Sequence, residues 1–169
     1  MTDEHALDTP TPFTLRSANA DDVAFLQEVY ASTRADELTQ LPWNEAQRSA
    51  FIRMQFTAQR QHYLKNYPHA RQDLILVGDK PVGRLYVNRG EQEIHIIDIT
   101  VLPEHRGQGI GSSILKSLIE ESTEAHKSTT VYVESFNPSR RLFERLAFEE
   151  IETDGINLLL ERPAGTLTQ

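Results

Sequence analysis

A glycine-rich segment behind an apolar run is the part of this chain best suited to chemistry. Residues 101–111 read Val-Leu-Pro-Glu-His-Arg-Gly-Gln-Gly-Ile-Gly, with glycine at every second position near the end. Glycines let successive backbone N–H groups converge ahead of a helix, where the helix dipole favours an anion. The spacing therefore predicts a cradle for a phosphate group, and a side chain at Gly109 is expected to fill it.

Two common phosphate-binding loops do not fit this segment. A P-loop needs Gly-Lys followed by Ser or Thr, and no such tripeptide follows. A dinucleotide fingerprint needs G-x-G-x-x-G within a parallel strand–helix–strand unit. Here Gly107, Gly109 and Gly111 leave a shorter last gap, and the strands before them are expected to be antiparallel.

The pattern that fits is R-x-x-G-x-G, formed by Arg106, Gly109 and Gly111 after a strand that ends in Val-x-Pro. It resembles the acetyl-CoA-binding motif of the GNAT superfamily of N-acetyltransferases. The resemblance implies that loop amides hold the coenzyme pyrophosphate and that the preceding strand holds the pantetheine. The implied coenzyme contacts are Ile99, Thr100, Val101, Arg106, Gly107, Gln108, Gly109, Ile110, Gly111 and Ser112.

A second segment, residues 137–148, resembles the other signature of the same family. There an Asn ends a strand, and a short helix closes with Tyr-x-x-x-Gly-Phe. The resemblance implies coenzyme contacts from Asn137, Arg140 and Phe143. Two plainer interpretations stay open: alternating glycines also mark tight connections that bind nothing, and Asn137 alone could be a turn residue.

The activity that the resemblance implies is transfer of an acetyl group from acetyl-CoA to a primary amine, with coenzyme A as product. The acceptor could be a small molecule, an amino acid or a protein amino group. Because a lysine-like ammonium has a pKa of about 10.4, it must lose a proton before it attacks, and a base is expected. Backbone N–H groups of the strand are expected to stabilise the developing oxyanion.

Four side chains on two strands are candidates for proton transfer. Family members often have an acidic base six residues before the Val that closes the strand, and His95 holds that position here. Neutral histidine can accept a proton near pH 7. Asp98 interrupts an apolar run and must be hydrogen-bonded, linked to water or at a bulge. Glu134 and Tyr132 share one face of the next strand; each of the four could instead be structural.

Two residues depart from the family pattern. Phe143 stands where the family often has a Tyr that protonates the leaving sulfur, so a non-catalytic acyl-CoA-binding or regulatory module is the alternative function. Catalysis could also proceed without an acid, since a thiol has a reference pKa of about 8.5, or with Tyr132 in its place. Ala147 replaces a Gly, which suggests a backbone that does not need positive φ. Transfer of an acyl group longer than acetyl is a further possible activity.

Acceptor contacts are expected from the N-terminal helices and the loop between them. Trp43 beside acidic residues could frame a cationic amine through its ring face, with Glu37 and Tyr63 as further contacts. Phe51 and Met54, at helical spacing, are expected in the core.

The elements that must position these residues follow from apolar periodicity. The N-terminal part predicts a strand at 13–16, a helix capped by Asn19, a loop at 36–42 and a helical stretch at 43–67. The remainder predicts an antiparallel meander at 74–77, 82–88 and 93–102, a helix at 110–125, a strand at 129–135, a short helix at 139–147 and a hairpin at 150–153 and 156–161. The order predicts an α+β domain with a single mixed, mostly antiparallel sheet flanked by helices, and the resemblance implies that this is the GNAT-like fold.

Length and composition limit the number of domains and the classes of function that the chain can have. A chain of 169 residues suits one domain, expected at 13–162, with a flexible N-terminal tail at 1–12 and a C-terminal tail at 163–169. The absence of cysteine excludes disulfides and thiolate metal sites, and no metal site is predicted. A net charge of −8 argues against non-specific nucleic-acid binding. No signal peptide or membrane-spanning run is found, so a cytoplasmic location is expected; a homodimer stays open.

Overall fold

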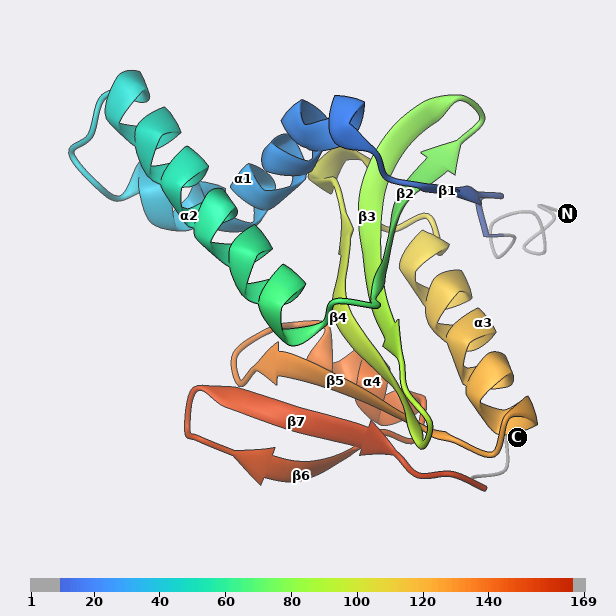
Figure 1. The fold of residues 1–169 in the computed structure, drawn as a ribbon. Coiled ribbons are helices and arrows are strands. Elements are labelled where there is room, and N and C mark those ends of the chain that lie inside the picture. The colour runs from blue at the N-terminus through green and yellow to red at the C-terminus, as the bar shows by residue number, and fades with distance from the viewer. Residues whose placement is uncertain (1–9, 166–169) are drawn as a thin grey trace, which may run out of the picture.

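The computed structural model describes residues 10–165 and has one mixed seven-stranded sheet, in the order β1-β2-β3-β4-β5-β7-β6 (Figure 1). Its strands are β1 (Thr14–Ser17), β2 (Arg71–Val77), β3 (Lys80–Arg89), β4 (Glu93–Val101), β5 (Ser128–Glu134), β6 (Glu149–Thr153) and β7 (Asn157–Arg162). Neighbouring strands are antiparallel except β4 and β5. The predicted α+β architecture and meander are confirmed.

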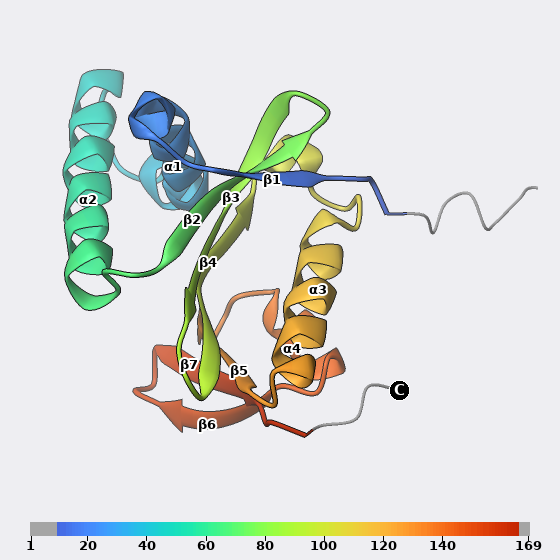
Figure 2. The same cartoon turned by 45° about the vertical axis from the view of Figure 1, so that its right-hand side comes forward.

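Helices cover both faces of the sheet (Figure 2). The helices are α1 (Val23–Thr39), α2 (Glu45–Asn66), α3 (Ile110–Glu124) and α4 (Arg140–Arg145). Helix α3 buries the predicted stripe of Ile110, Ile114 and Leu118 in the main core beneath the sheet, beside Leu115 and Ile119. Helices α1 and α2 build a second core on the opposite face. No helix within residues 10–165 is long and apolar enough to span a membrane.

The two N-terminal helices differ from expectation at two places. Asn19 caps the start of α1 as predicted, through a short 3₁₀ turn at Ala20–Asp22. The helix then runs on to Thr39, so the loop predicted at 36–42 is wrong in its first half, because Leu38 is buried in the second core and holds the last turn. The core placement of Met54 is also wrong, since its side chain is 59% exposed.

The end of α4 corrects the expectation for Ala147. Its φ is +69°, in the left-handed region. Beyond α4, the Phe148 N–H donates to the Phe143 carbonyl at 3.0 Å, and the Ala147 N–H donates to the Glu144 carbonyl at 3.1 Å. This is a Schellman closure, which requires a left-handed residue after the helix cap. The two phenylalanine rings then pack edge to face at 5.2 Å, so the backbone here does need positive φ.

Replacement of Ala147 by glycine should therefore stabilise the protein. A left-handed conformation costs a non-glycine residue about 1–2 kcal/mol, and the extra backbone entropy of glycine offsets part of the gain. We expect Ala147→Gly to raise the free energy of unfolding by about 0.5–1 kcal/mol in urea denaturation. The control Ala50→Gly, on the exposed face of α2, should lower it by about 1 kcal/mol. Destabilisation by both changes would contradict the explanation.

Candidate functional site

Strand β4 has a free edge in its second half. It pairs with β5 only from Glu93 to Ile96, and one extra residue, Ile97, bulges where its register with β3 shifts. Beyond the bulge, the Leu102 N–H donates to Val82 on the β3 side at 2.8 Å. Successive residues of an antiparallel strand direct their N–H and C=O groups alternately to one side and the other. The backbone N–H and C=O of Ile99 therefore point away from β3, toward β5. The sheet is therefore open at Ile99.

Two adjoining cavities lie at this opening. The smaller, about 370 Å³, extends over β3 toward α1 and α2. The larger, about 590 Å³, extends past the end of β4 toward Arg106 and the β5–α4 connection. The residues that line both are Thr33, Glu37, Ile99, Thr100, Glu134, Asn137 and Ser139. A ligand in one cavity can thus meet a ligand in the other at the free edge of β4.

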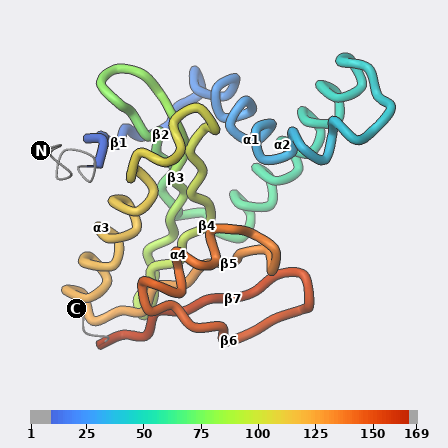
Figure 3. The backbone as a smooth tube through the Cα atoms, turned by 180° about the vertical axis from the view of Figure 1, so that it is seen from behind, coloured from blue at the N-terminus to red at the C-terminus, as the bar shows by residue number. Residues whose placement is uncertain are grey.

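The glycine loop connects β4 to α3 (Figure 3), and it presents a row of free backbone donors. No backbone N–H from Gly107 to Ser112 donates a hydrogen bond to another residue within 10–165. Gly107 and Gly109 have φ of 77° and 81°, which other residues rarely adopt. Free donors at the start of a 15-residue helix suit a phosphate. The Arg106 guanidinium instead donates to the Val101 carbonyl at 2.9 Å.

Gly109 has a different role from the one expected. A Cβ at this position would lie 3.0 Å from the Pro10 Cβ, in the segment before β1, and would meet no other described residue. A Cβ at Gly107 or Gly111 would meet nothing within 4 Å. The expectation that a side chain at Gly109 would fill the cradle is therefore wrong, because such a side chain would first strike Pro10.

The second predicted motif lines the cavities only in part. The Asn137 side-chain oxygen accepts from the N–H and hydroxyl of Ser139 at 2.9 and 2.8 Å. Asn137 is thus a turn residue that also borders both cavities. Phe143 is buried and lines the smaller cavity. Arg140 lines neither, and its guanidinium donates to Glu144 at 2.9 Å.

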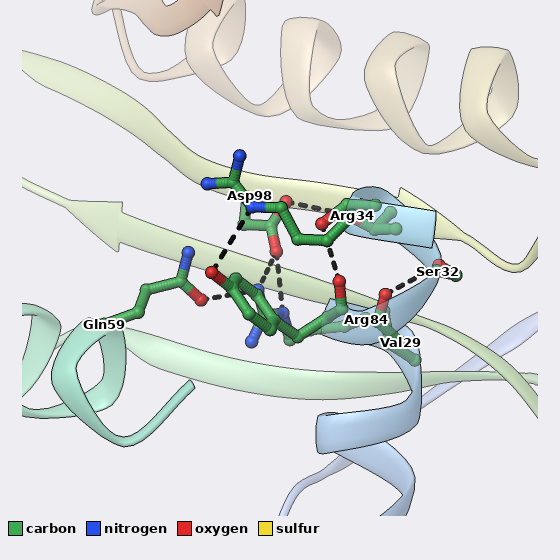
Figure 4. Close-up of polar contacts among 9 residues, drawn as sticks. Val29, Ser32, Arg34, Gln59, Arg84 and Asp98 are labelled. Carbon is green, nitrogen blue, oxygen red and sulfur yellow. Dashed lines mark hydrogen bonds and ion pairs between the residues drawn. The ribbon is translucent and has the colours of Figure 1, made fainter. Parts of the chain in front are cut away.

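Asp98 is held in a network on the floor of the smaller cavity (Figure 4). Its Oδ2 accepts from both Nε (2.7 Å) and Nη2 of Arg84, and its Oδ1 accepts from Thr100 at 2.8 Å. Gln59 on α2 accepts a further hydrogen bond from Arg84 at 3.3 Å. Arg84 is 4% exposed, so it needs this carboxylate as its counter-ion. The expectation that Asp98 is hydrogen-bonded is confirmed.

Glu134 and Tyr132 project from β5 at the same opening. Glu134 is half-buried, lines both cavities and has no ion pair with another residue in 10–165. Tyr132 is 54% exposed and lines the smaller cavity. Glu37 also lines both cavities, but Arg34 pairs with it at 3.2 Å. Of these groups, Glu134 is the carboxylate left free to accept a proton.

His95 lies outside both cavities. It is 6% exposed, its Nδ1 lies 2.8 Å from the Thr130 hydroxyl, and the Tyr67 ring stacks on it at 5.5 Å. The Thr130 hydroxyl donates to Glu93 at 3.1 Å, so it accepts from the imidazole. Burial lowers the pKa of His95, against a smaller opposing effect of Glu93. The imidazole is therefore neutral at pH 7, but the structure does not bring it to the cavities.

The expected acceptor contacts separate in space. Tyr63 and Glu37 line the smaller cavity. Trp43 does not, because its ring packs on Phe51 at 5.2 Å within the second core. Burial, with the nearby Asp98 carboxylate, raises the pKa of Tyr63 to about 12. Its phenol therefore stays protonated at neutral pH and can only exchange hydrogen bonds with a ligand.

Sequence reasoning missed other polar residues of the smaller cavity. Tyr30 and Arg34 on α1, Gln59 on α2 and Arg84 on β3 all line it. Arg34 donates to the Tyr30 hydroxyl at 3.3 Å. One signal was available: Arg84 is a lone charge in an apolar strand, opposite the segment that carries Asp98 in the predicted meander. The α1 residues give no such signal, because Arg34 looks like an ordinary exposed helix residue.

Comparison with known proteins agrees with this geometry. The chain resembles a crystal structure of PaiA N-acetyltransferase from Thermoplasma acidophilum in complex with coenzyme A, at 15% identity and a TM-score of 0.66, over 90% of this chain and 99% of that one. It also resembles an acetyltransferase from Thermus thermophilus, at 18% identity and a TM-score of 0.66, over 92% of this chain and 99% of that one. These likenesses show the fold.

Sequence comparison shows the family. A protein named N-alpha-acetyltransferase from Sulfurisphaera tokodaii is 31% identical over 61 residues, which is 34% of this chain and 36% of that protein. The match thus spans about a third of that relative. The model of the acetyltransferase (GNAT) family matches residues 31–148. Because this match covers more than half of the chain, the chain belongs to the acetyltransferase (GNAT) family.

Neutralisation of Asp98 should destabilise the protein much more than neutralisation of Glu134. Asp98→Asn leaves the Arg84 guanidinium buried without a counter-ion, so we expect the free energy of unfolding to fall by at least about 2 kcal/mol. The matched change Glu134→Gln removes a carboxylate without an ion pair and should alter it by less than about 0.5 kcal/mol. Urea denaturation of both variants measures this. Equal losses would show that Asp98 is not the structural carboxylate.

Proposed function

We propose that this chain transfers an acetyl group from acetyl-CoA to a primary amine. The observation that carries the proposal is the free backbone edge at Ile99, which lies between the donor row of the glycine loop and the Glu134 carboxylate. These groups match the three needs of the reaction: a held donor, a polarised acyl oxygen and a base.

The larger cavity suits the coenzyme. Residues 107–112 offer free N–H groups for a pyrophosphate, and the backbone of Ile99 can pair with an extended amide chain as a strand would. Asn137 borders the same cavity from the connection between β5 and α4. Acetyl-CoA supplies an acetyl group activated as a thioester. The complex of PaiA with coenzyme A supports this assignment by its similar fold.

The smaller cavity suits the amine. Glu134 lies where the two cavities meet and is free to remove a proton from the ammonium. Glu37 on α1 adds a second carboxylate to the lining of this cavity, beside its ion-pair partner Arg34. Tyr63, held protonated, and Arg84 give the floor hydrogen-bonding groups. We therefore assign the base to Glu134 ahead of His95, which lies beneath Tyr67 outside this cavity.

The leaving sulfur has no proton donor at position 143. Phe143 is buried against Phe148, and its ring cannot supply one. Tyr132 carries the exposed phenol on β5 and lines the cavity from the same side. We assign any protonation of the sulfur to Tyr132, or to solvent. A cytoplasmic location without nucleic-acid or membrane partners stays a prediction.

Thiol release tests the proposal directly. We expect the protein to bind coenzyme A by calorimetry and to release free thiol from acetyl-CoA, detected by a chromogenic disulfide, when primary amines are added. The panel comprises polyamines, amino acids, lysine derivatives and peptides with free N-termini. Coenzyme binding without acceptor-dependent thiol release across this panel would favour the non-catalytic binding module. Absence of coenzyme binding would overturn the proposal.

Neutralisation of Glu134 should affect turnover alone. General base catalysis contributes about 10²- to 10⁴-fold, so Glu134→Gln should lower kcat by at least about 10²-fold at pH 7. The affinity for coenzyme A should not change, because the loop donors are untouched. The control Asp36→Asn removes a carboxylate that lines the larger cavity alone and should change kcat less than threefold, about the scale of rim charges. A larger loss of kcat in Asp36→Asn than in Glu134→Gln would show that Asp36, and not Glu134, is the base.

A further inference from the structure

The segment before β1 contacts the glycine loop. The Thr11 N–H donates to the Gln108 carbonyl at 2.9 Å, and the Thr11 hydroxyl lies 3.4 Å from the Gln108 side-chain oxygen. Pro10 covers the α-carbon of Gly109, with its Cβ 3.0 Å from where a side chain would begin. Nearly a hundred residues separate these partners in the chain. This part of the expected N-terminal tail is thus tied to the loop.

The hydrogen bond has a geometric consequence for the donor row. The Gln108–Gly109 peptide is trans, as are all peptides in residues 10–165. In a trans peptide the C=O and the N–H point in opposite directions. A carbonyl held by Thr11 therefore turns the Gly109 N–H away from the N-terminal segment. That N–H has no acceptor in the described residues.

Without these contacts the Gln108–Gly109 peptide would be free to rotate. Gly109 has no side chain to hold it, and glycine populates positive and negative φ about equally. At the observed φ of 81° its carbonyl accepts from Ser113 and starts α3. Two sets of contacts thus keep the Gln108–Gly109 peptide in one orientation. Pro10 and Thr11 contact it from the N-terminal segment, and the first turn of α3 holds the residue that follows it.

We propose that Pro10 and Thr11 are positioning residues of the coenzyme site, which hold the Gln108–Gly109 peptide so that its N–H faces the pyrophosphate. This inference rests on the proposed function. The segment touches neither the thioester end of the site nor the acceptor cavity. Its contribution is therefore confined to ligands that carry a pyrophosphate.

Thr11→Pro removes the critical N–H and puts a ring carbon where that hydrogen meets the Gln108 carbonyl, so it breaks the contact with the loop. Thr11 precedes Pro12 and is already restricted to extended conformations, which proline also adopts. Loss of one preorganised donor should weaken coenzyme A binding about three- to tenfold and raise the KM for acetyl-CoA equally. The kcat and the acceptor KM should stay unchanged. Thr11→Ala keeps the N–H and should bind coenzyme A within about twofold of the wild-type protein.

A truncated acetyl donor distinguishes a positioning role of Thr11 from a general structural effect of the substitution. S-acetylpantetheine lacks the pyrophosphate and the nucleotide, so Thr11→Pro and the wild type should use it with the same kcat/KM. Equal loss with both donors would overturn the proposal, as would unchanged coenzyme A affinity in Thr11→Pro. If Thr11→Pro unfolds on heating at a much lower temperature, Pro10→Gly provides the second variant, with a smaller loss of the same selectivity expected. A wild-type protein that does not bind coenzyme A would instead refute the proposed function.

Discussion

The divergence of β4 from β5 is the constraint on which the rest of the site depends. Pairing stops at Ile96 and Val131, just where the bulge at Ile97 redirects β4. Past that point the Ile99 backbone has lost its neighbour, and unpaired polar groups inside a fold are costly unless something binds them. A ligand with an extended amide chain can take that place. The binding edge thus exists because the sheet is left incomplete at its centre.

The same strand determines where the glycine loop lies. Only the turn at Pro103–His105 separates the end of β4 from the loop, and α3 follows at once. Helix α3 cannot shift, because Ile110 and Ile114 are fully buried in the main core. The free edge and the donor row are therefore held at a constant separation by packing beneath the sheet. The N-terminal segment then holds the Gln108–Gly109 peptide, which lies outside this packing.

Local patterns predicted the elements and much of the site, and long-range contacts account for the rest. Alternating apolar residues gave the meander, helical spacing gave α3, and the two motifs gave the loop and Asn137. The left-handed backbone at Ala147 was missed because the motif's glycine had been replaced, while the packing of Phe148 kept the conformation. The contact of Pro10 with Gly109 could not be predicted, since no sequence pattern joins such distant segments.

The assignment of the base shows why the structure was needed to choose among candidates. In the sequence, Asp98 and Glu134 are both carboxylates on strands next to the loop. Their difference lies in a third strand, because β3 brings Arg84 to Asp98 and brings no cation to Glu134. The Asp98 carboxylate is the counter-ion of a buried guanidinium, and hydrogen bonds from Arg84 and Thr100 already engage both of its oxygens. Glu134 has no ion pair with another residue in 10–165 and lines both cavities, and for these two reasons we propose it as the base.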